Sequence, residues 1–161
     1  MILGIISDTH GNKKNTIKAL DIFTRESIKT ILHAGDFGSR ELLTLFDQFE
    51  IHLAYGNTDS ETDLPKTLFK AQNQPWPEKE QKLEFAGKKI LLLHGDHSPN
   101  LQEKIKSGKY DYIIKGHTHF PEDYRFQHTR VLNPGALHRA DTYSVGILDL
   151  INDEWRVLPV C

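Results

Sequence analysis

The sequence has few of the features that mark secreted or nucleic-acid-binding proteins. Its 161 residues include one cysteine, Cys161, so no disulfide can form within the chain and a reducing compartment is favoured. Lysine and arginine number 20 against 22 aspartate and glutamate residues, which gives a formal net charge of −2. Proteins that bind duplex nucleic acid usually carry a strong basic excess. Nucleic acid is therefore not expected as a bulk partner.

No apolar run in the sequence is long enough to cross a membrane. The longest early stretch, Ile2–Ile6, ends at Ser7-Asp8, with no basic leader before it and no stop-transfer pattern downstream. We therefore expect a cytoplasmic protein with no membrane partner. Repeats and low-complexity segments are also lacking, and a composition of 38% apolar and 26% charged residues is that of an ordinary globular protein. The length predicts one domain over residues 1–161.

What the sequence does contain is a series of short apolar segments that end in polar turns. Ile2–Ile6 is typical of a strand buried on both faces, and Asp8 and His10 follow it directly. Two residues apart in an extended chain, these side chains point the same way and could reach one cation. Taken alone, Asp8 would be interpreted as an ordinary turn residue before Gly11-Asn12, and His10 as a surface histidine. The repetition of the pattern argues against that interpretation.

Helices and strands alternate in the first part of the chain. Residues 13–26 are predicted to form a helix that covers a sheet, with an apolar face of Ile17, Leu20 and Phe23. Strands are predicted at Thr30–Ala34 and Ile51–Tyr55, with a helix between them that Ser39 caps. This alternation indicates βαβ units and a largely parallel sheet, in which ligand sites gather at the carboxyl ends of the strands.

The second part of the chain is predicted to be rich in strands. It begins with a proline-containing excursion at Ser60–Pro77, which includes at most one helical turn and, at that length, is functional or mobile. A short helix is expected at Leu101–Ser107. The predicted strands are Glu80–Phe85, Lys88–Leu93, Tyr110–Lys115, Tyr124–His128, Thr129–Leu132, Tyr143–Leu150 and Trp155–Val160. We infer two sheets packed face to face, with helices outside and polar turns along one rim.

Five of the predicted strands end in a turn that combines glycine with aspartate, asparagine or histidine. Glycine allows the backbone to approach a buried ion closely. Carboxylate, amide oxygen and imidazole without thiolate suit Mn²⁺, iron, Ni²⁺ or Zn²⁺ in five- or six-coordinate geometry. With one bridging carboxylate, seven such residues would give two ions four protein ligands each. The candidates are Asp8, His10, Asp36, Asn57, His94, His117 and His119.

These motifs carry a family resemblance. The ordered series Asp8-Thr9-His10, Gly35-Asp36, Gly56-Asn57, His94-Gly95 and Gly116-His117-Thr118-His119 resembles that of the calcineurin-like metallophosphoesterases. It is most similar to the small bacterial and archaeal phosphodiesterases, which share their fold with the retromer subunit VPS29. The resemblance extends from Ile2 to about Val160, and Asn133-Pro134-Gly135-Ala136 matches the group's Asn-Pro-Gly-Ser apart from its last residue. It implies an α/β fold, a four-layer α/β/β/α sandwich of two mixed β-sheets, with a binuclear metal centre.

The resemblance also implies a ligand set and a reaction. Asp8, His10, Asp36 and His119 would hold the first ion, and Asp36, Asn57, His94 and His117 the second, with Asp36 as the bridge. Mn²⁺ is the metal expected first, with Ni²⁺, iron or Zn²⁺ as alternatives. Water on a metal ion has its pKa lowered toward ~7, so hydroxide could attack the phosphorus of a small phosphoester in line. Asp36, Asn57 and His94 are then the expected catalytic residues.

One position departs from the larger members of the family. They have a histidine, thought to protonate the leaving oxygen, where this chain has Thr58. The general acid is therefore unassigned, and His97 and Asp96 are candidates by sequence alone, with surface loop residues as the competing interpretation. Asn12 could contact substrate phosphate or complete a turn. His33 is expected to be a partly buried structural histidine, and structural or surface roles are expected for His52, His128 and His138.

Two alternatives to a phosphodiesterase stay open at this point. An adaptor could use the same fold as a binding platform, although it would not need the complete ligand set that this sequence retains. A phosphomonoesterase would use the same centre with different substrate contacts. The sequence specifies neither the natural substrate nor whether the chain forms a homo-oligomer.

Overall fold

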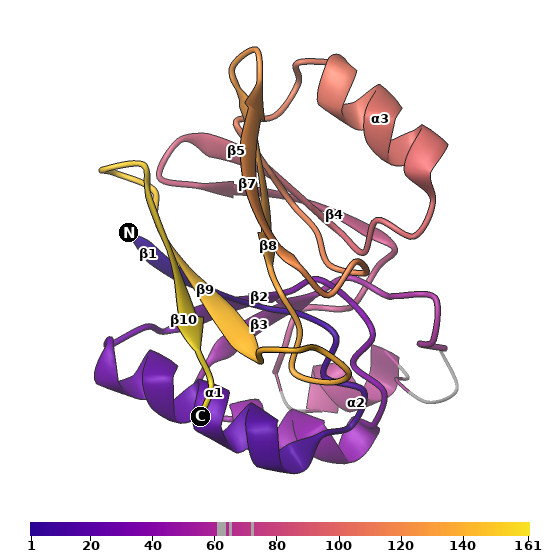
Figure 1. Ribbon diagram of the computed structural model, residues 1–161. Coiled ribbons are helices and arrows are strands. Elements are labelled where there is room, and N and C mark those ends of the chain that lie inside the picture. Colours follow the sequence, from indigo (N-terminus) through magenta and orange to yellow (C-terminus); the bar gives the residue numbers. More distant parts are fainter. Residues whose placement is uncertain (61–63, 65, 72) are drawn as a thin grey trace.

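The structure is a computed structural model that describes residues 1–60, 64, 66–71 and 73–161. Two mixed five-stranded sheets pack face to face, and helices cover their outer faces (Figure 1). The predicted α/β/β/α arrangement is therefore confirmed.

The first sheet is built around the N-terminal strand. Its strands β1, β2 and β3 are parallel. Beyond β1 the sheet continues with β9, which is antiparallel to β1, and β10, which is antiparallel to β9. In spatial order the strands are β10 (Glu154–Pro159), β9 (Ser144–Asp149), β1 (Ile2–Ile6), β2 (Thr30–His33) and β3 (Glu50–Leu53). The carboxyl ends of three neighbouring parallel strands consequently lie at one edge.

The second sheet has parallel strands in its centre and antiparallel strands at its edges. β5, β6 and β8 run parallel, while β4 and β7 flank them. The order is β4 (Glu80–Phe85), β5 (Lys88–Leu93), β6 (Tyr112–Ile114), β8 (Thr129–Pro134) and β7 (Pro121–Phe126). Both sheets therefore combine parallel and antiparallel pairs and are mixed, as predicted.

Three buried apolar clusters hold the layers together. Leu3, Ile5 and Leu32 of the first sheet pack against Leu92 and Ile114 of the second. A larger cluster lies under α1 (Lys13–Arg25), the 3₁₀ helix η1 (Arg40–Phe46) and α2 (Lys66–Ala71), and a smaller one under α3 (Ser98–Lys106). Figure 1 shows α1 and α2 on one side of the molecule and α3 on the other. Burial on both faces explains why the parallel strands are continuous apolar runs.

The predicted apolar face of the first helix is wrong at one position. Leu20 and Phe23 are buried, but Ile17 is 41% exposed. The helix is rotated so that Asn15 and Thr16 face the interior, where the Asn15 amide donates to the Leu137 carbonyl (2.9 Å) and the Thr16 hydroxyl to the Asn12 carbonyl (2.8 Å). Because these polar groups have hydrogen-bond partners, they can lie on the buried face of the helix, where the apolar spacing predicted Ile17.

Three further predictions differ in detail from the structure. The helix after Ser39 is 3₁₀ rather than α, and Ser39 caps it by accepting from the Glu41 N–H. The helix predicted at Leu101–Ser107 begins earlier, at Ser98, since His97 caps it. The excursion at Ser60–Pro77 contains α2, and its residues 61–63, 65 and 72 lie outside the described part of the chain. Within the described ranges, no helix combines the length and apolar character that a bilayer span requires.

Candidate metal centre

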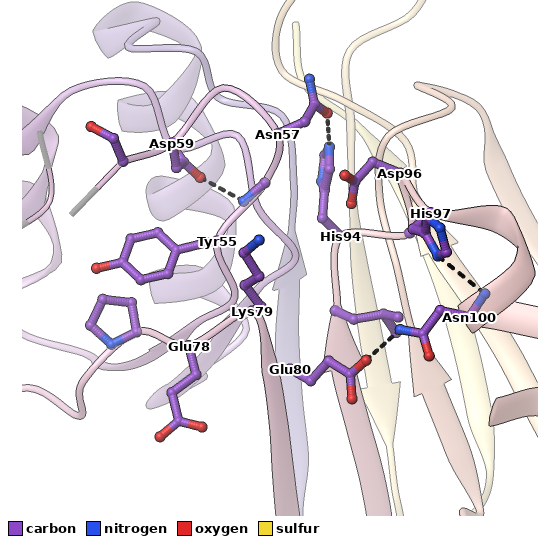
Figure 2. A pocket seen from close by; sticks show the side chains of 15 residues that line it. Tyr55, Asn57, Asp59, Glu78, Lys79, Glu80, His94, Asp96, His97 and Asn100 are labelled. Carbon is purple, nitrogen blue, oxygen red and sulfur yellow. Dashed lines mark hydrogen bonds between the residues drawn. The ribbon is translucent and has the colours of Figure 1, made fainter.

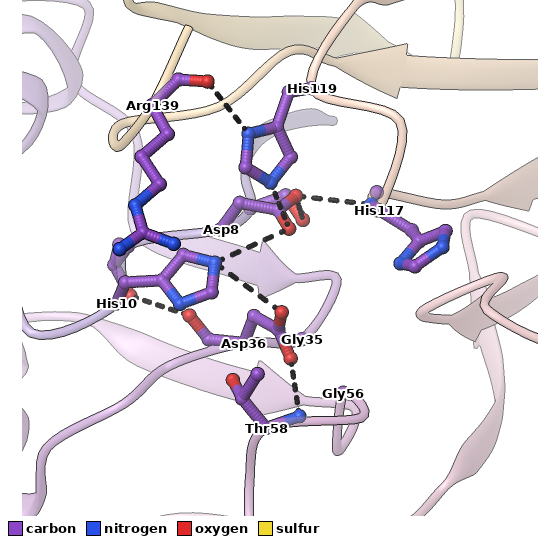
Figure 3. A network of polar contacts seen from close by, with 12 residues as sticks. Asp8, His10, Gly35, Asp36, Gly56, Thr58, His117, His119 and Arg139 are labelled. Atoms are coloured by element: carbon purple, nitrogen blue, oxygen red, sulfur yellow. Dashed lines mark hydrogen bonds and ion pairs between the residues drawn. The ribbon is translucent and has the colours of Figure 1, made fainter.

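The structure brings all seven predicted ligands to the carboxyl ends of five strands. Asp8 and His10 follow β1, Asp36 follows β2, and Asn57 follows β3. The remaining three come from the second sheet, His94 after β5 and His117 and His119 after β6 (Figures 2 and 3). Residues separated by more than a hundred positions in sequence therefore meet at one rim between the two sheets.

Asp8 presents one free oxygen to two histidines. Its side chain is fully buried, and its Oδ2 atom accepts from the Ser7 hydroxyl (2.6 Å) and the His117 backbone N–H (3.1 Å). The Oδ1 atom has no hydrogen-bond partner among the described residues, and lies 3.2 Å from His119 Nε2 and 4.0 Å from His10 Nε2. A buried carboxylate oxygen without a donor is costly unless a cation compensates it. The geometry fits a cation between Asp8, His10 and His119.

The hydrogen bond behind His119 fixes which ring nitrogen can bind a cation. His119 Nδ1 lies 3.1 Å from the Arg139 carbonyl oxygen, which accepts only, so Nδ1 carries the proton. In the neutral ring the Nε2 lone pair then faces Asp8 Oδ1, another acceptor. Such an outer hydrogen bond is the usual support of a metal-binding histidine.

His94 repeats this arrangement on the other side. Its Nδ1 donates to the Ala34 carbonyl (2.8 Å), which leaves Nε2 as a lone pair in the neutral ring. That Nε2 lies 3.0 Å from Asn57 Oδ1 and 3.2 Å from His117 Nδ1. Oxygen and nitrogen acceptors this close require a proton or a metal cation between them.

Asp36 lies where the two groups of ligands meet. Its Oδ1 accepts from the Thr58 backbone N–H (2.9 Å), while Oδ2 lies 3.3 Å from His10 Nε2 and 3.5 Å from His94 Nε2 (Figure 3). Burial by itself would raise the pKa of this carboxyl. The Thr58 N–H, together with His94 and His10, more than offsets that effect, so the pKa of Asp36 is below its ordinary value. Asp36 is therefore ionised at neutral pH, as a metal-binding carboxylate must be.

The backbone at this rim is strained. Five of the seven candidates have positive φ angles, a region that costs non-glycine residues about 1–3 kcal/mol each and that clusters at functional sites. Backbone hydrogen bonds between the turns hold this geometry, such as Asp8 N–H to the Gly35 carbonyl (3.0 Å) and His10 N–H to the Asp36 carbonyl (2.9 Å). The residues and angles are Asp8 (53°), His10 (43°), Asp36 (55°), His117 (68°) and His119 (62°).

Two glycines are required by close approach to the carboxylates. A Cβ atom on Gly56 would collide with Asp36 Oδ1, and one on Gly116 would collide with the Ser7 hydroxyl and Asp8 Oδ2. The glycines that the sequence places in these turns therefore make room for the ligand side chains themselves.

His33 ties two ligand-bearing turns together. Its Nδ1 accepts from the Gly35 N–H (3.2 Å), so Nε2 carries the proton and donates to the Thr9 hydroxyl (3.0 Å), which in turn donates to the Phe37 carbonyl (2.9 Å). Complete burial, with a smaller contribution from His94, lowers the pKa of His33 to about 3. The predicted structural role is confirmed, and this histidine is neutral.

The remaining sequence candidates have mixed outcomes. Asn12 caps α1 by accepting from the Asn15 N–H (3.1 Å) and donates to the Leu137 carbonyl (3.2 Å), so its polar atoms complete the turn. His97 accepts from the Asn100 N–H (3.4 Å) through Nδ1, which leaves its Nε2 for other contacts. Asp96 and His97 both line a cavity beside His94.

That cavity has a volume of about 650 Å³, within the range of small-molecule sites. Two of the candidate ligands, Asn57 and His94, form part of its wall, and Tyr55, Lys79 and Asn100 are among its other lining residues (Figure 2).

Sequence reasoning missed two residues near the first group of ligands. The His138 ring, taken as structural or surface, lies with its centroid 5.3 Å from that of His10. Arg139, with a positive φ of 48°, supplies the carbonyl for His119, and its side chain extends toward His10 (Figure 3). Both follow the Asn133-Pro134-Gly135-Ala136 turn, which was the one available signal.

The fold and this donor set are those of a metal-dependent hydrolase. Residues 1–153 match the calcineurin-like phosphoesterase superfamily domain. The chain belongs to this superfamily, which confirms the resemblance seen in the sequence, and it is a metallophosphoesterase.

Named relatives agree with this placement. The chain is 34% identical over 161 residues to the phosphodiesterase MJ0936 of Methanocaldococcus jannaschii, with 97% of both chains covered. It superposes on a solved archaeal phosphodiesterase with a TM-score of 0.92 at 34% identity, over 99% of both chains. Vps29 of Entamoeba histolytica, solved in complex with zinc, has a TM-score of 0.68 at 18% identity over 100% of both chains, a likeness of fold alone.

Proposed function

We propose that this protein hydrolyses phosphodiesters at a centre of two divalent metal ions. The first ion would be held by Asp8, His10, Asp36 and His119, and the second by Asp36, Asn57, His94 and His117. The observation that carries this proposal is the position of Asp36 Oδ2, which is within 3.5 Å of a histidine from each set. A bridging carboxylate needs such a position, because it must reach both ions and offset their mutual repulsion.

The donor set suits two such ions in other respects as well. Asp8 Oδ1 is buried and has no hydrogen-bond partner in the part of the chain that the structure describes. The lone pairs of His94 Nε2 and Asn57 Oδ1 face each other. Carboxylate, amide and imidazole ligands suit Mn²⁺, which we propose as the working metal. Structural zinc sites are instead rich in thiolate ligands. When bound, such ions supply Lewis acidity and lower the pKa of water, so no side chain need act as the nucleophile.

The residues of the chain would orient the reaction. The Thr58 N–H holds one oxygen of Asp36 and thereby aims the other at the centre. The Ala34 and Arg139 carbonyls fix the tautomers of His94 and His119. We assign catalytic roles to Asp36, Asn57 and His94. Asp36 would bridge the two ions, and Asn57 and His94 also line the cavity that would receive the substrate.

The preference for diesters over monoesters is supported by the relative in Methanocaldococcus jannaschii, which is named a phosphodiesterase. A diester carries organic groups on both sides of its phosphate. The cavity of about 650 Å³ beside Asn57 and His94 would take one of them.

Metal binding alone does not separate this proposal from an adaptor function. Vps29 of Entamoeba histolytica shares the fold and was solved with zinc. The discriminating measurement is therefore turnover, assayed on metal-depleted protein refilled separately with Mn²⁺, Ni²⁺, Zn²⁺ and Fe²⁺ against a panel of phosphodiesters and phosphomonoesters. We expect Mn²⁺-dependent hydrolysis of diesters.

A matched pair of histidine variants controls this experiment. His94→Gln should lose turnover, whereas His128→Gln, at an exposed histidine that is not among the candidate ligands, should keep it. Absence of turnover on every ester with every metal would contradict the proposal and favour the adaptor.

A further inference from the structure

The cavity beside Asn57 and His94 contains one lysine, Lys79, whose charge is not compensated. Lys79 is exposed and makes no ion pair or hydrogen bond among the described residues, unlike Lys104, which pairs with Glu80 at 2.7 Å just outside the cavity. Figure 2 shows its side chain between Tyr55 and His94, with the ammonium directed toward the turn that carries Asn57 and Asp59. The ammonium is therefore on the side of the cavity that adjoins the candidate ligands.

Two of the four acidic side chains that line this cavity are already engaged. Asp59 accepts from three backbone N–H groups, those of Phe37 (3.1 Å), Gly38 (3.0 Å) and Gly56 (2.9 Å). Glu80 accepts from Asn100 (2.5 Å) and Lys104 (2.7 Å).

Two acidic side chains remain around the cavity. Glu78 points away from it in Figure 2. Asp96 lies beside His94, on the wall where the proposed cations would attract it. Among the four acidic residues that line the cavity, none forms an ion pair with Lys79, and we expect none to neutralise its charge.

We propose that Lys79 is a specificity-determining residue that binds an anionic substituent on the ester group occupying the cavity. This inference rests on the proposed function and narrows its substrate class to phosphodiesters that carry a second negative charge, such as a carboxylate or another phosphate. A lysine ammonium can bind a carboxylate or a phosphate, because it is a compact positive charge with three hydrogen-bond donors. Because Lys79 lines the cavity, its ammonium can reach an anionic group on an ester substituent held there.

The test uses two phosphodiesters with the same p-nitrophenyl leaving group. The second ester group ends in a carboxylate in one compound and in the primary amide in its twin, so the two differ in charge and hardly in shape. We expect the Mn²⁺-loaded protein to favour the carboxylate about tenfold in kcat/KM, through a lower KM, as for one charge-assisted hydrogen bond. Added salt should reduce the preference.

Three variants assign the effect to Lys79. In Lys79→Met the ratio of the two kcat/KM values should fall to about one. In Lys79→Arg most of the preference for the carboxylate compound should remain. Lys109→Met removes an exposed lysine that does not line the cavity, and should keep the full ratio. An equal ratio in the unmodified protein and Lys79→Met, whatever its size, overturns the inference.

Failure of the proposed function gives a different result. If neither compound is hydrolysed, calorimetric titration of the same pair decides for Lys79. Tighter binding of the carboxylate that is lost in Lys79→Met supports the anion site, and equal binding of both compounds contradicts it.

Discussion

The Nε2 atom of His94 lies 3.0 Å from Oδ1 of Asn57. Because His94 Nδ1 donates a hydrogen bond to the Ala34 carbonyl, Nε2 of the neutral ring carries a lone pair, and this lone pair faces the lone pairs of the Asn57 oxygen. A cation between them removes this conflict. Exhaustive chelation should therefore abolish hydrolysis and lower the melting temperature, and Mn²⁺ should restore both. Undiminished hydrolysis by protein that mass spectrometry shows to be metal-free would contradict the metal-dependent mechanism.

Replacing Asp36 should be more harmful than replacing His10. In our assignment Asp36 contacts both ions, whereas His10 serves one. Asp36→Asn should retain less than one ion per chain, and His10→Gln should retain close to one, with activity reduced by at least ~10²-fold in the first case. Metal content by elemental analysis separates the two variants. Two ions per chain with full activity in Asp36→Asn would show that another residue bridges.

The threonine at position 58 predicts a steep dependence on the leaving group. A positioned general acid contributes roughly 10²- to 10⁴-fold, about 3 to 5 kcal/mol of barrier, and a threonine hydroxyl has no useful acidity near neutral pH. Phosphodiesters with graded phenol and alcohol leaving groups should therefore react more slowly as the leaving-group pKa rises. Thr58→His should flatten this slope if its ring reaches the leaving oxygen. The Thr58→His variant would keep the backbone N–H that donates to Asp36, so the position of this carboxylate should not change.

A flat dependence in the unmodified protein, with chemistry shown to be rate-limiting, would mean that a general acid is present. His97 is then the first residue to replace, because it lines the cavity beside His94 and its Nε2 is free of the helix cap.

The neutral His33 should make the protein lose stability in mild acid. Its pKa is about 3 in the folded protein and 6.5 when exposed, so between these values the unfolded chain binds more protons. This histidine alone then lowers the free energy of unfolding by about 1.4 kcal/mol for each pH unit below 6.5. Urea unfolding between pH 6.5 and 4 should show a shallower slope in His33→Asn, whose side chain can still accept from the Gly35 N–H. The same slope in both proteins would contradict this account.

Much of the fold followed from local pattern in the sequence. Buried parallel strands such as Ile2–Ile6 are recognisable because both faces are apolar, and the glycines and polar residues after them mark the strand ends. The seven candidate ligands were found in the same way, since each lies in the turn that follows a strand.

What the sequence could not show depends on contacts between distant segments. Ile17 is exposed because Asn15 and Thr16 find buried partners, one of them at Leu137. Arg139 and Lys79 approach the centre from loops without a recognised ligand motif. The left-handed backbone of Asp8 and His10 likewise requires the neighbouring turn at Gly35–Phe37, whose carbonyls accept their N–H groups. Such positions are determined only when the sheets have assembled.

The most direct test of the two-ion centre is a crystal structure of the Mn²⁺-reconstituted protein with anomalous diffraction data. We predict two anomalous peaks per chain. Asp8, His10 and His119 should contact one, Asn57, His94 and His117 the other, and Asp36 both. A single peak at full occupancy in an active preparation, or two peaks without a shared Asp36, would contradict the account.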